Sequence, residues 1–406
     1  MNDGELDDGA ETLEITLEPG EYHVSLELAL TSGSYSEVHF DATFIEWDDV
    51  NGSLEGAHLD PVALEANIEE EVSLSLHPLW QLLETMGPDV YVGARESEIV
   101  HRLGPDGEEN TDGWPLEWPS EIWSLDHDGD DSLYLAGDGD VARINAADSD
   151  DWFWNNDTMG LVNNLALDAE GNAYATRDTA NDMQKIDPDS GAAEEWGGGN
   201  FRGVTVDPDG YAFGGTYDDG QGDDGAVHQI NPDGIVEWNT ETFHTGHIRD
   251  LEVDSAGHIY TASEDFFAKK IDVAVAGHST DPPDPADDLV GEFDAGAELH
   301  DIAVGPEGAV YLAADDGTVH RLDSSMSPVE FGEWPFDNHA STVHSVAVDR
   351  YGFVYSGDAD GVVHKIAPDG SPVTSGDWPF VHPGEARIWG LVTSQGRYPI
   401  HWQENE

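Results

Sequence analysis

Seven side chains with binding chemistry recur at one place in a repeated pattern, namely the beginning of a predicted strand. They combine indole, guanidinium, imidazole and amide groups, which together could hold a polar ligand such as a glycan. The same set would equally suit a plain solvated rim. The seven residues are Trp123, Asn163, Arg202, Arg249, His300, His344 and Trp389.

One acidic segment resembles the start of a calcium-binding loop. Asp126, Asp128 and Asp130 offer carboxylates at alternate positions of the sequence DHDGDD. An EF-hand loop ends with a bidentate Glu at its twelfth position, and here that position is Gly137. We therefore expect no resident cofactor and at most a weak cation site, with a solvated acidic turn as the alternative.

Four histidines share one position in the third strand of the repeat, and they invite a metal interpretation. Repeat units arranged in a ring would keep such side chains about 10 Å or more apart, whereas zinc ligands lie near 2 Å from the ion. We expect a structural role for all four. They are His101, His228, His320 and His364.

Positively charged residues are scarce, and many of them recur at one position of the repeat. Six of the 14 cationic side chains stand at the end of a third strand. A structural ion pair, for example with Asp168 or Asp349, is the first interpretation, and a ring that binds an anion is the alternative. The six residues are Arg102, Arg143, Lys185, Lys270, Arg321 and Lys365. No Ser/His/Asp or paired-carboxylate constellation can be singled out among 86 acidic residues.

The composition is that of an acidic globular protein. The 406 residues carry a formal net charge of -72, include no Cys, and hold 13 Trp, 13 Phe and 12 Tyr, which argues against disorder. Molar salt shortens the screening length to about 3 Å and removes most of the self-repulsion of such a chain. We expect a protein of an extreme halophile or of its virus. Binding to nucleic acid is not expected at this charge, nor is membrane insertion, because no apolar run is long enough.

A repeat after residue 87 decides the expected fold. Its second strand carries an aromatic residue seven times, at spacings of 39 to 51 residues, and its third strand ends in a cation or Gln followed by Ile or Leu. The seven aromatic markers are Tyr91, Tyr134, Tyr174, Phe213, Tyr260, Tyr311 and Tyr355. Four short strands per unit of this length predict the blade of a β-propeller.

The sequence predicts an all-β chain with a seven-bladed propeller over residues 87–406. The first blade lacks its own first strand, and the segment Arg387–Val392 near the chain end supplies an unpaired one. We expect these two to pair and close the ring, which removes exposed sheet edges. The seven residues at the beginnings of the first strands would then face the mouth of the central channel.

Residues 1–86 are expected to form a separate N-terminal domain. Alternating apolar residues, for example at Tyr22, Val24, Leu26, Leu28 and Leu30, predict strands with one buried face and hence a small β-sandwich. A short helical connector is expected over residues 77–86, and residues 1–11 are expected to form an acidic tip. This domain would attach the propeller to an assembly.

The segment Val354–Trp378, VYSGDADGVVHKIAPDGSPVTSGDW, resembles the repeat of quinoprotein-like (PQQ-like) propellers. The segment Leu165–Thr176, LALDAEGNAYAT, is similar to NHL-type repeats. The resemblance covers residues 89–396 and implies a propeller. Quinone-dependent dehydrogenases of that kind have eight blades, a vicinal Cys pair and a calcium site, so a chain without Cys is not expected to bind a quinone.

Two classes of function follow from these expectations. The first is a non-catalytic structural protein on the virion surface of a haloarchaeal virus, in its tail or capsid. Its propeller would bind a host cell-surface protein or glycan, and residues 1–86 would contact other virion proteins. The second is a quinoprotein-like or sugar-converting enzyme in the cytoplasm of a salt-in halophile, where a scaffold propeller is a third possibility.

Overall fold

The computed structural model describes two compact units, which divide between Gln81 and Leu82. In the first unit it describes the backbone of six short strands only. In the second it describes residues 87–397, except residues 112, 148–151, 178–181, 218–224, 241–242, 274–287, 330–331 and 385. None of the helices in this described part of the chain is long and apolar enough to cross a membrane.

The described strands of the first unit form three antiparallel pairs. The pairs are nested along the chain, with the hairpin β3–β4 innermost and the pair β1–β6 outermost. Their bounds are β1 Leu26–Leu28, β2 Val38–Phe40, β3 Thr43–Asp48, β4 Ser53–His58, β5 Val62–Leu64 and β6 Val72–Leu74. The predicted sandwich packing, helical connector and acidic tip lie outside the described residues.

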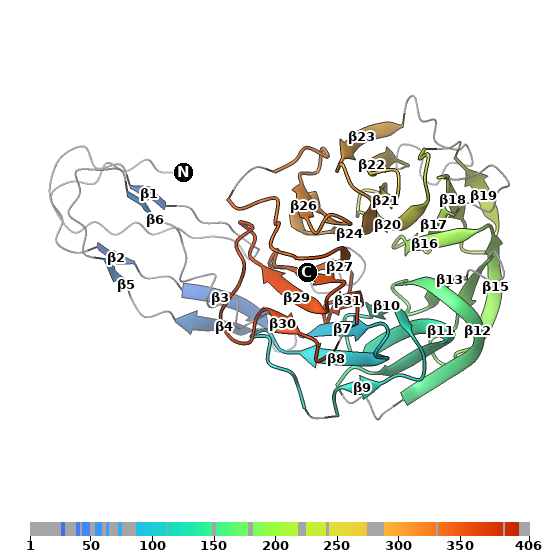
Figure 1. Cartoon of the computed structure of the whole chain (residues 1–406), viewed down its shortest axis with the longest axis horizontal. Helices are drawn as coiled ribbons and strands as arrows, with labels where there is room; N and C mark the ends of the chain where they lie inside the picture. The colour runs from blue at the N-terminus through green and yellow to red at the C-terminus, as the bar shows by residue number, and fades with distance from the viewer. Residues whose placement is uncertain are drawn as a thin grey trace. The chain divides into compact units, whose positions relative to one another are not determined.

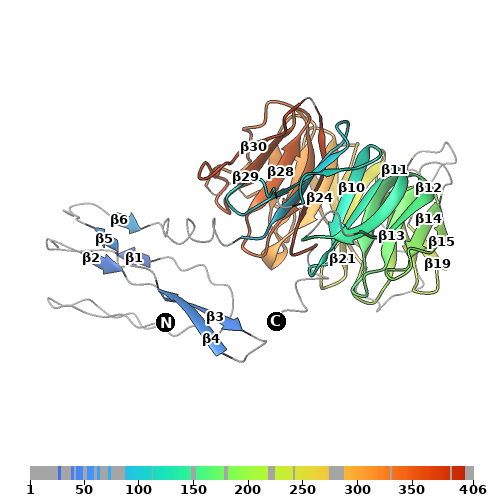
Figure 2. The same cartoon turned by 90° about the horizontal axis from the view of Figure 1, so that it is seen from below.

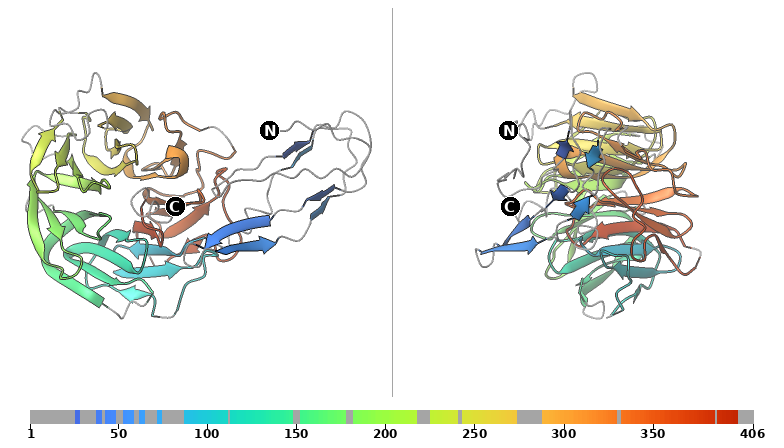
Figure 3. Two further views of the ribbon diagram at one scale, coloured as in Figure 1. Left: turned by 180° about the vertical axis from the view of Figure 1, so that it is seen from behind. Right: turned by 90° about the vertical axis from the view of Figure 1, so that its left-hand side faces the viewer.

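The second unit is a β-propeller of six antiparallel sheets placed around a central channel (Figure 1). The view from behind shows the same ring, with the sheets following one another in chain order (Figure 3, left). The prediction of a propeller is confirmed, and the prediction of seven blades is wrong. The ring is six-bladed because two of the predicted repeat units, those of Tyr134 and Tyr174, belong to one six-stranded sheet.

Two long strands cause this merger. The sequence GDGD at residues 137–140 looks like a turn, but the chain stays extended through it as part of β11. A register shift between Gly139 and Val141 absorbs the irregularity, and Gly139 adopts a φ of 109°, which glycine tolerates. β11 then pairs along β12, whose 16 residues continue into the next repeat.

Three sheets make up the first half of the ring. The first sheet comprises β31 Ile388–Thr393, β7 Val90–Ala94, β8 Ile99–Leu103 and β9 Leu116–Glu117. The second comprises β10 Ile122–His127, β11 Ser132–Asn145, β12 Trp152–Leu167, β13 Ala173–Arg177, β14 Asp182–Ile186 and β15 Ala193–Gly198. The third comprises β16 Phe201–Val206, β17 Ala212–Thr216, β18 Val227–Ile230 and β19 Val236–Asn239.

The remaining three sheets complete the ring. The fourth comprises β20 Ile248–Val253, β21 His258–Ser263, β22 Phe267–Asp272 and β23 Leu289–Asp294. The fifth comprises β24 Leu299–Val304, β25 Val310–Ala314 and β26 Val319–Leu322, with the 3-10 helix η2 Pro306–Gly308 between its first two strands. The sixth comprises β27 Val343–Val348, β28 Val354–Asp358, β29 Val362–Ile366 and β30 Phe380–Val381.

The ring is closed by the C-terminal strand, as the sequence predicts. β31 lies antiparallel to β7, with Leu391 opposite Val92 and Val392 opposite Tyr91, and the two strands lie side by side in Figure 1. The turn after β31 adds a bond from the backbone N–H of Asp89 to Ser394 Oγ at 3.1 Å. Figure 2 shows the sheets of the ring stacked against one another from the side.

The repeated aromatic residues form the core between sheets. All seven markers are buried, and four of the tyrosines pack against a Trp from the end of their own repeat. Several tyrosine hydroxyls donate to a buried aspartate in the preceding turn, for example Tyr355 to Asp349 at 3.1 Å and Tyr174 to Asp168 at 2.9 Å. The marker therefore both fills the core and satisfies a buried carboxylate.

The scarce third-strand cations join each repeat to the next one. Five of them donate to a backbone carbonyl of the following repeat, at 2.6 to 3.1 Å. These pairs are Arg102 with Ala147, Arg143 with Pro188, Lys270 with Ser324, Arg321 with Pro368 and Lys365 with Pro105. Lys185 instead lies 4.0 Å from Asp168, one of the two predicted partners. The contacts favour the structural interpretation over an anion-binding ring.

Candidate functional site

Seven inner strands line the channel, and each contains a β-bulge, which falls at the second residue of six of them and at Asn163 in the long strand β12. The ladder skips one residue in every case, between Ile122 and Ser124 in β10 and between Leu299 and Asp301 in β24, for example. The same shift occurs in β12, β16, β20, β27 and β31. A bulge leaves one residue unpaired and redirects its side chain.

The seven skipped residues are the seven that the sequence predicts at the channel mouth. All of them line a single cavity that is open to solvent. They are Trp123, Asn163, Arg202, Arg249, His300, His344 and Trp389. The structure therefore brings the predicted set together, and their role in binding a ligand stays a prediction.

One half of the mouth is a continuous aromatic surface. The ring of Trp389 stacks on His344 at a centroid distance of 4.3 Å and meets Trp123 edge-on at 5.6 Å. His300 meets His344 at 4.8 Å in a T-shaped arrangement. Four side chains from β10, β24, β27 and β31 therefore form one aromatic wall.

Two arginines from outside the predicted set cover this wall. The guanidinium of Arg95 lies 3.5 Å from the ring centre of Trp123 and 4.8 Å from that of Trp389. Arg95 also forms an ion pair with Glu121 at 2.8 Å. Arg387 lies 5.4 Å from the ring centre of Trp389 and pairs with Glu96. Cation–π contacts of this kind hold the indole rings in place.

The other half of the mouth is polar and cationic. Arg249 pairs with Glu264 at 2.6 Å and lies 3.6 Å from Glu298. Arg202 lies 3.8 Å from the same Glu264 carboxylate. Each guanidinium in this half thus lies close to a rim carboxylate. Asn163 adds a neutral amide to the lining of the cavity.

The two histidines of the mouth are held in their neutral form. Burial lowers the pKa of His300 to about 4 and that of His344 to about 3. The charge of Arg249 further lowers the pKa of His300, and the imidazole of His300 further lowers the pKa of His344. Both rings are therefore uncharged near pH 7, where each has one N–H donor and one nitrogen acceptor.

A second layer of side chains forms the floor of the cavity. Asn164 donates to Asp250 Oδ1 at 2.6 Å and accepts from the Ser124 hydroxyl at 3.1 Å. Asp301 faces Asp250 and accepts the backbone N–H of Val346 at 2.7 Å. Burial and the neighbouring charge of Asp250 raise the pKa of Asp301 well above its ordinary value, which favours the protonated form of Asp301.

Arg397 lies below this floor, inside the channel. Its Nη1 is 3.0 Å from Glu252 Oε1 and its Nε is 3.6 Å from Asp126 Oδ2. Burial raises the pKa of Glu252 to about 8 and that of Asp126 to about 6, although the Arg397 charge opposes both shifts. Arg397 borders the mouth cavity and a second cavity on its other side.

Sequence reasoning missed this inner layer. Asp250 and Glu252 stand at alternate positions just after Arg249, and Asp126 follows Ser124 at the same interval, so the period of a strand could have placed them along the channel. Arg397 follows the last strand and belongs to no repeat. No sequence signal could have placed it in the channel.

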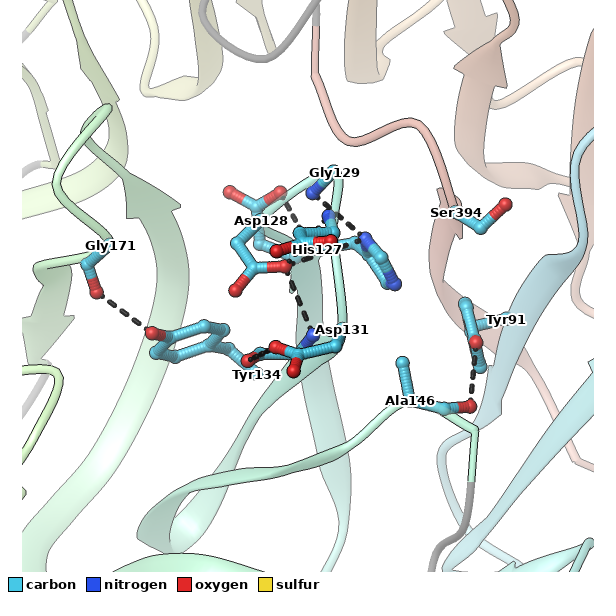
Figure 4. Close-up of polar contacts among 12 residues, drawn as sticks. Tyr91, His127, Asp128, Gly129, Asp131, Tyr134, Ala146, Gly171 and Ser394 are labelled. Atoms are coloured by element: carbon cyan, nitrogen blue, oxygen red, sulfur yellow. Dashed lines mark hydrogen bonds and ion pairs between the residues drawn. The ribbon is translucent and has the colours of Figure 1, made fainter. Parts of the chain in front are cut away.

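The predicted calcium ligands are not brought together. Asp126 points into the channel toward Arg397, whereas Asp128 Oδ1 accepts the backbone N–H groups of Asp130 and Ser132 at 3.0 Å. Figure 4 shows this turn, in which the Gly129 N–H donates to His127 Nδ1 at 2.9 Å. In the described ranges of the chain, no group of His, Asp and Glu side chains could hold a metal ion.

The four third-strand histidines lie in different sheets and pack structurally. His101 contacts Glu109 at 2.5 Å and His382 at 2.8 Å, both through its ring nitrogens. His228 and His320 meet Phe201 and Phe293 edge-on. His364 meets Phe336 and His339 in the same way, so the structural interpretation agrees with the contacts.

Two buried groups of side chains have the hydroxyl–imidazole–carboxylate arrangement of a catalytic triad. The sequence alone could not single them out. His339 bridges Ser356 Oγ at 2.8 Å and Asp358 at 3.0 Å. His244 bridges Thr261 Oγ1 at 2.7 Å and Asp265 at 3.0 Å. Both hydroxyl residues are fully buried, so a substrate cannot reach them. The two hydrogen-bond networks stabilise the fold instead.

Comparison with known proteins supports the fold. A streptogramin B lyase structure aligns with a TM-score of 0.55 at 12% identity, over 76% of this chain and 92% of that one. Virginiamycin B lyase from Staphylococcus aureus aligns with a TM-score of 0.52 at 12% identity, over 65% and 85%. The WD40 β-propeller domain of Doa1 aligns with a TM-score of 0.52 at 17% identity, over 69% and 90%.

These similarities define the fold of the protein and no more. The chain is a β-propeller. No protein-family profile matches its sequence. No curated protein matches it either. Its activity must therefore be argued from its own residues.

Proposed function

We propose that this chain is a non-catalytic binding protein of a halophilic system and that the mouth of its channel recognises a glycan. The observation that carries the proposal is the mouth cavity, where seven bulged side chains from seven strands converge. Repeated bulges at one register are a costly way to build a plain rim, whereas they are a common way to aim side chains at a ligand.

The chemistry of the mouth suits a sugar. The wall of Trp123, His344 and Trp389, with the Arg95 guanidinium over it, would contact the apolar C–H groups of a pyranose ring. Trp123 Nε1, His300 Nδ1 and His344 Nδ1 are buried atoms that make no hydrogen bond to the described residues. Donors and acceptors of this kind, next to the Arg249 guanidinium and the Asn163 amide, would match hydroxyl groups.

Composition supports the halophilic part of the proposal. A net charge of -72 with 14 cations calls for strong screening, and several of these cations are used inside the ring, as Lys365 and Arg321 are. A chain that lives in molar salt gains little from exposed ion pairs, because salt screens them.

The remaining part of the proposal concerns the place of action. We assign the chain to the surface of a haloarchaeal virus particle, with residues 1–86 contacting the assembly and the propeller contacting a host-surface glycan or protein. The domain plan and the composition support this assignment. Mass spectrometry of purified particles and of soluble host lysate tests it, since finding the protein only in the lysate would favour a cytoplasmic scaffold.

The binding test uses the aromatic wall. Isothermal titration in 3 M KCl with a panel of neutral, acidic and amino saccharides measures binding to the wild type, to Trp389→Ala and to Ile235→Ala. Ile235 is 60% exposed and does not line the mouth cavity, so its replacement is the matched control. We expect Trp389→Ala to weaken binding at least tenfold, because it removes the centre of the stacked wall. Equal affinity of the three proteins would place the binding elsewhere.

One observation favours a second candidate, a sugar-converting enzyme. Asp301 is a carboxyl group in the cavity whose pKa is raised well above its ordinary value, which favours the protonated form that a general acid needs. Product analysis after prolonged incubation with the saccharides that bind would decide between the two. Turnover that is lost in Asp301→Asn would make the protein an enzyme, and unchanged ligand would leave it a binding protein.

A further inference from the structure

The charges of the mouth are divided unevenly between rim and floor. At the rim, each guanidinium that borders or covers the cavity lies close to a carboxylate. The pairs are Arg95 with Glu121, Arg249 with Glu264 and Glu298, Arg202 with Glu264, and Arg387 with Glu96. These cations are not available for a ligand anion without breaking an ion pair. The rim therefore offers little attraction for an acidic ligand.

The floor and channel have the opposite balance. Four carboxyl groups, those of Asp126, Asp250, Glu252 and Asp301, surround the one guanidinium of Arg397. Arg397 contacts two of them, at 3.0 and 3.6 Å. Asp250 and Asp301 are left on the side that faces the mouth cavity.

Asp250 lines this cavity beside Asp301. The residue is 2% exposed, and its Oδ1 accepts from Asn164 while its Oδ2 accepts no hydrogen bond from the described residues when Asp301 is ionised. Burial, the charge of Asp250 and a hydrogen bond to Asp250 together raise the pKa of Asp301. When Asp301 holds its proton it donates it to Asp250, so the two acids share one proton and retain one negative charge at the cavity floor.

The geometry favours an organic cation over a metal ion. The carboxyl groups do not converge on a point, and the described residues contain no cluster that could hold a metal. They do accommodate one planar guanidinium, that of Arg397, between two strands. An ammonium or guanidinium group carries several N–H donors and can reach separated acceptors.

We propose that the ligand of the channel mouth carries an ammonium or guanidinium group, which binds Asp250 and Asp301 at the cavity floor. This inference rests on the proposed function in assigning the ligand to the mouth, and it narrows the expected saccharide to an amino sugar. The ring of the sugar would lie against Trp389, and its cationic substituent would point down the channel toward Asp250.

The test separates the cation from the sugar. Saturation-transfer NMR in 3 M KCl, observed on the methyl protons of methylguanidinium, methylammonium and acetate, measures binding of the charged group alone. A second titration compares an amino saccharide with its neutral parent. The proteins are the wild type, Asp250→Asn and Asp189→Asn, where Asp189 is an exposed turn residue and gives the same change of charge. Circular dichroism confirms that each variant is folded.

We expect both organic cations to bind and acetate not to bind. Asp250→Asn should weaken cation binding about tenfold and abolish the preference for the amino saccharide, whereas Asp189→Asn should behave as the wild type. Saccharide binding without any preference for the amino form, or without an effect of Asp250→Asn, would overturn the inference and leave the proposed function standing. Cation binding without binding of any saccharide would overturn the proposed function and leave the cation site standing.

Discussion

Replacing Lys365 tests how the ring uses its few positive charges. Lys365 is fully buried and donates to the carbonyl of Pro105 at 2.9 Å, which ties the sixth sheet to the first. Its charge also lowers the pKa of Asp349, whose burial raises that pKa to about 6. Lys365→Met keeps the length of the side chain and removes the charge and the donors.

The expected cost follows from two contributions. Loss of a hydrogen bond from a charged donor costs about 1.5 to 3 kcal/mol. The second contribution is the cost of the buried Asp349 charge without its cation. Without Lys365 the pKa of Asp349 rises above about 6, and once it passes 7 the carboxyl group takes up a proton at pH 7. Protonation therefore limits this cost to about 1 kcal/mol. We expect Lys365→Met to lower the free energy of unfolding by about 3 to 4 kcal/mol at pH 7.

The assay is urea unfolding in 3 M KCl, with a matched control and a double variant. Lys185 holds the same register but is 22% exposed and 4.0 Å from Asp168, so Lys185→Met should cost about 1 kcal/mol or less. Lys365→Met with Asp349→Asn removes both charges and should regain about 1 kcal/mol over Lys365→Met alone. Equal costs for the two lysines, or strict additivity in the double variant, would refute the reasoning.

Four further predictions concern closure, ionisation and salt. Deleting residues 386–406 removes β31 and Arg397, so we expect aggregation or unfolding in size-exclusion chromatography, and a stable monomer would contradict the closed ring. Glu252 has a folded pKa of about 8, above its ordinary value, so it stabilises the fold only in its protonated form. The wild type should therefore lose stability as the pH rises from about 4 to 8, and Glu252→Gln should reduce that loss; parallel pH profiles would exclude this role. Asp265 has a lowered pKa because of His244, so Asp265→Asn should destabilise the fold at neutral pH and have little effect below the lowered pKa of the folded state, as melting curves at neutral and strongly acidic pH can show. Dialysis from molar to about 0.1 M KCl lengthens the screening distance from about 3 to about 10 Å and should lower the melting temperature, whereas an unchanged melt would argue against halophilic adaptation.

The repeated part of the structure could be predicted because each marker has one physical task. Tyr355 must fill the core and bond to Asp349, and Lys365 must reach the next repeat, so both recur at fixed spacing. The mouth residues could be predicted because they hold one register of the inner strands. Both predictions therefore rest on the periodicity of the sequence repeat.

The errors arose where the chain departs from periodicity. The sequence at residues 137–140 contains turn-forming residues, yet pairing with β12 keeps it extended, and one sheet replaces two predicted blades. Arg397 stands outside the repeat, so the cation in the channel was not foreseen. The three predicted calcium ligands lie close in sequence but do not converge. Asp128 accepts hydrogen bonds from backbone N–H groups, whereas Asp126 faces the channel.

The position of a bound saccharide tests the central claim most directly. A crystal structure of the full chain with an amino saccharide, grown from molar KCl, would show where the sugar lies. We predict that it lies in the mouth cavity, with its ring against Trp389 and its amino group within hydrogen-bonding distance of Asp250. A saccharide found on the outer face of a sheet, with the mouth cavity free of it, would contradict the account.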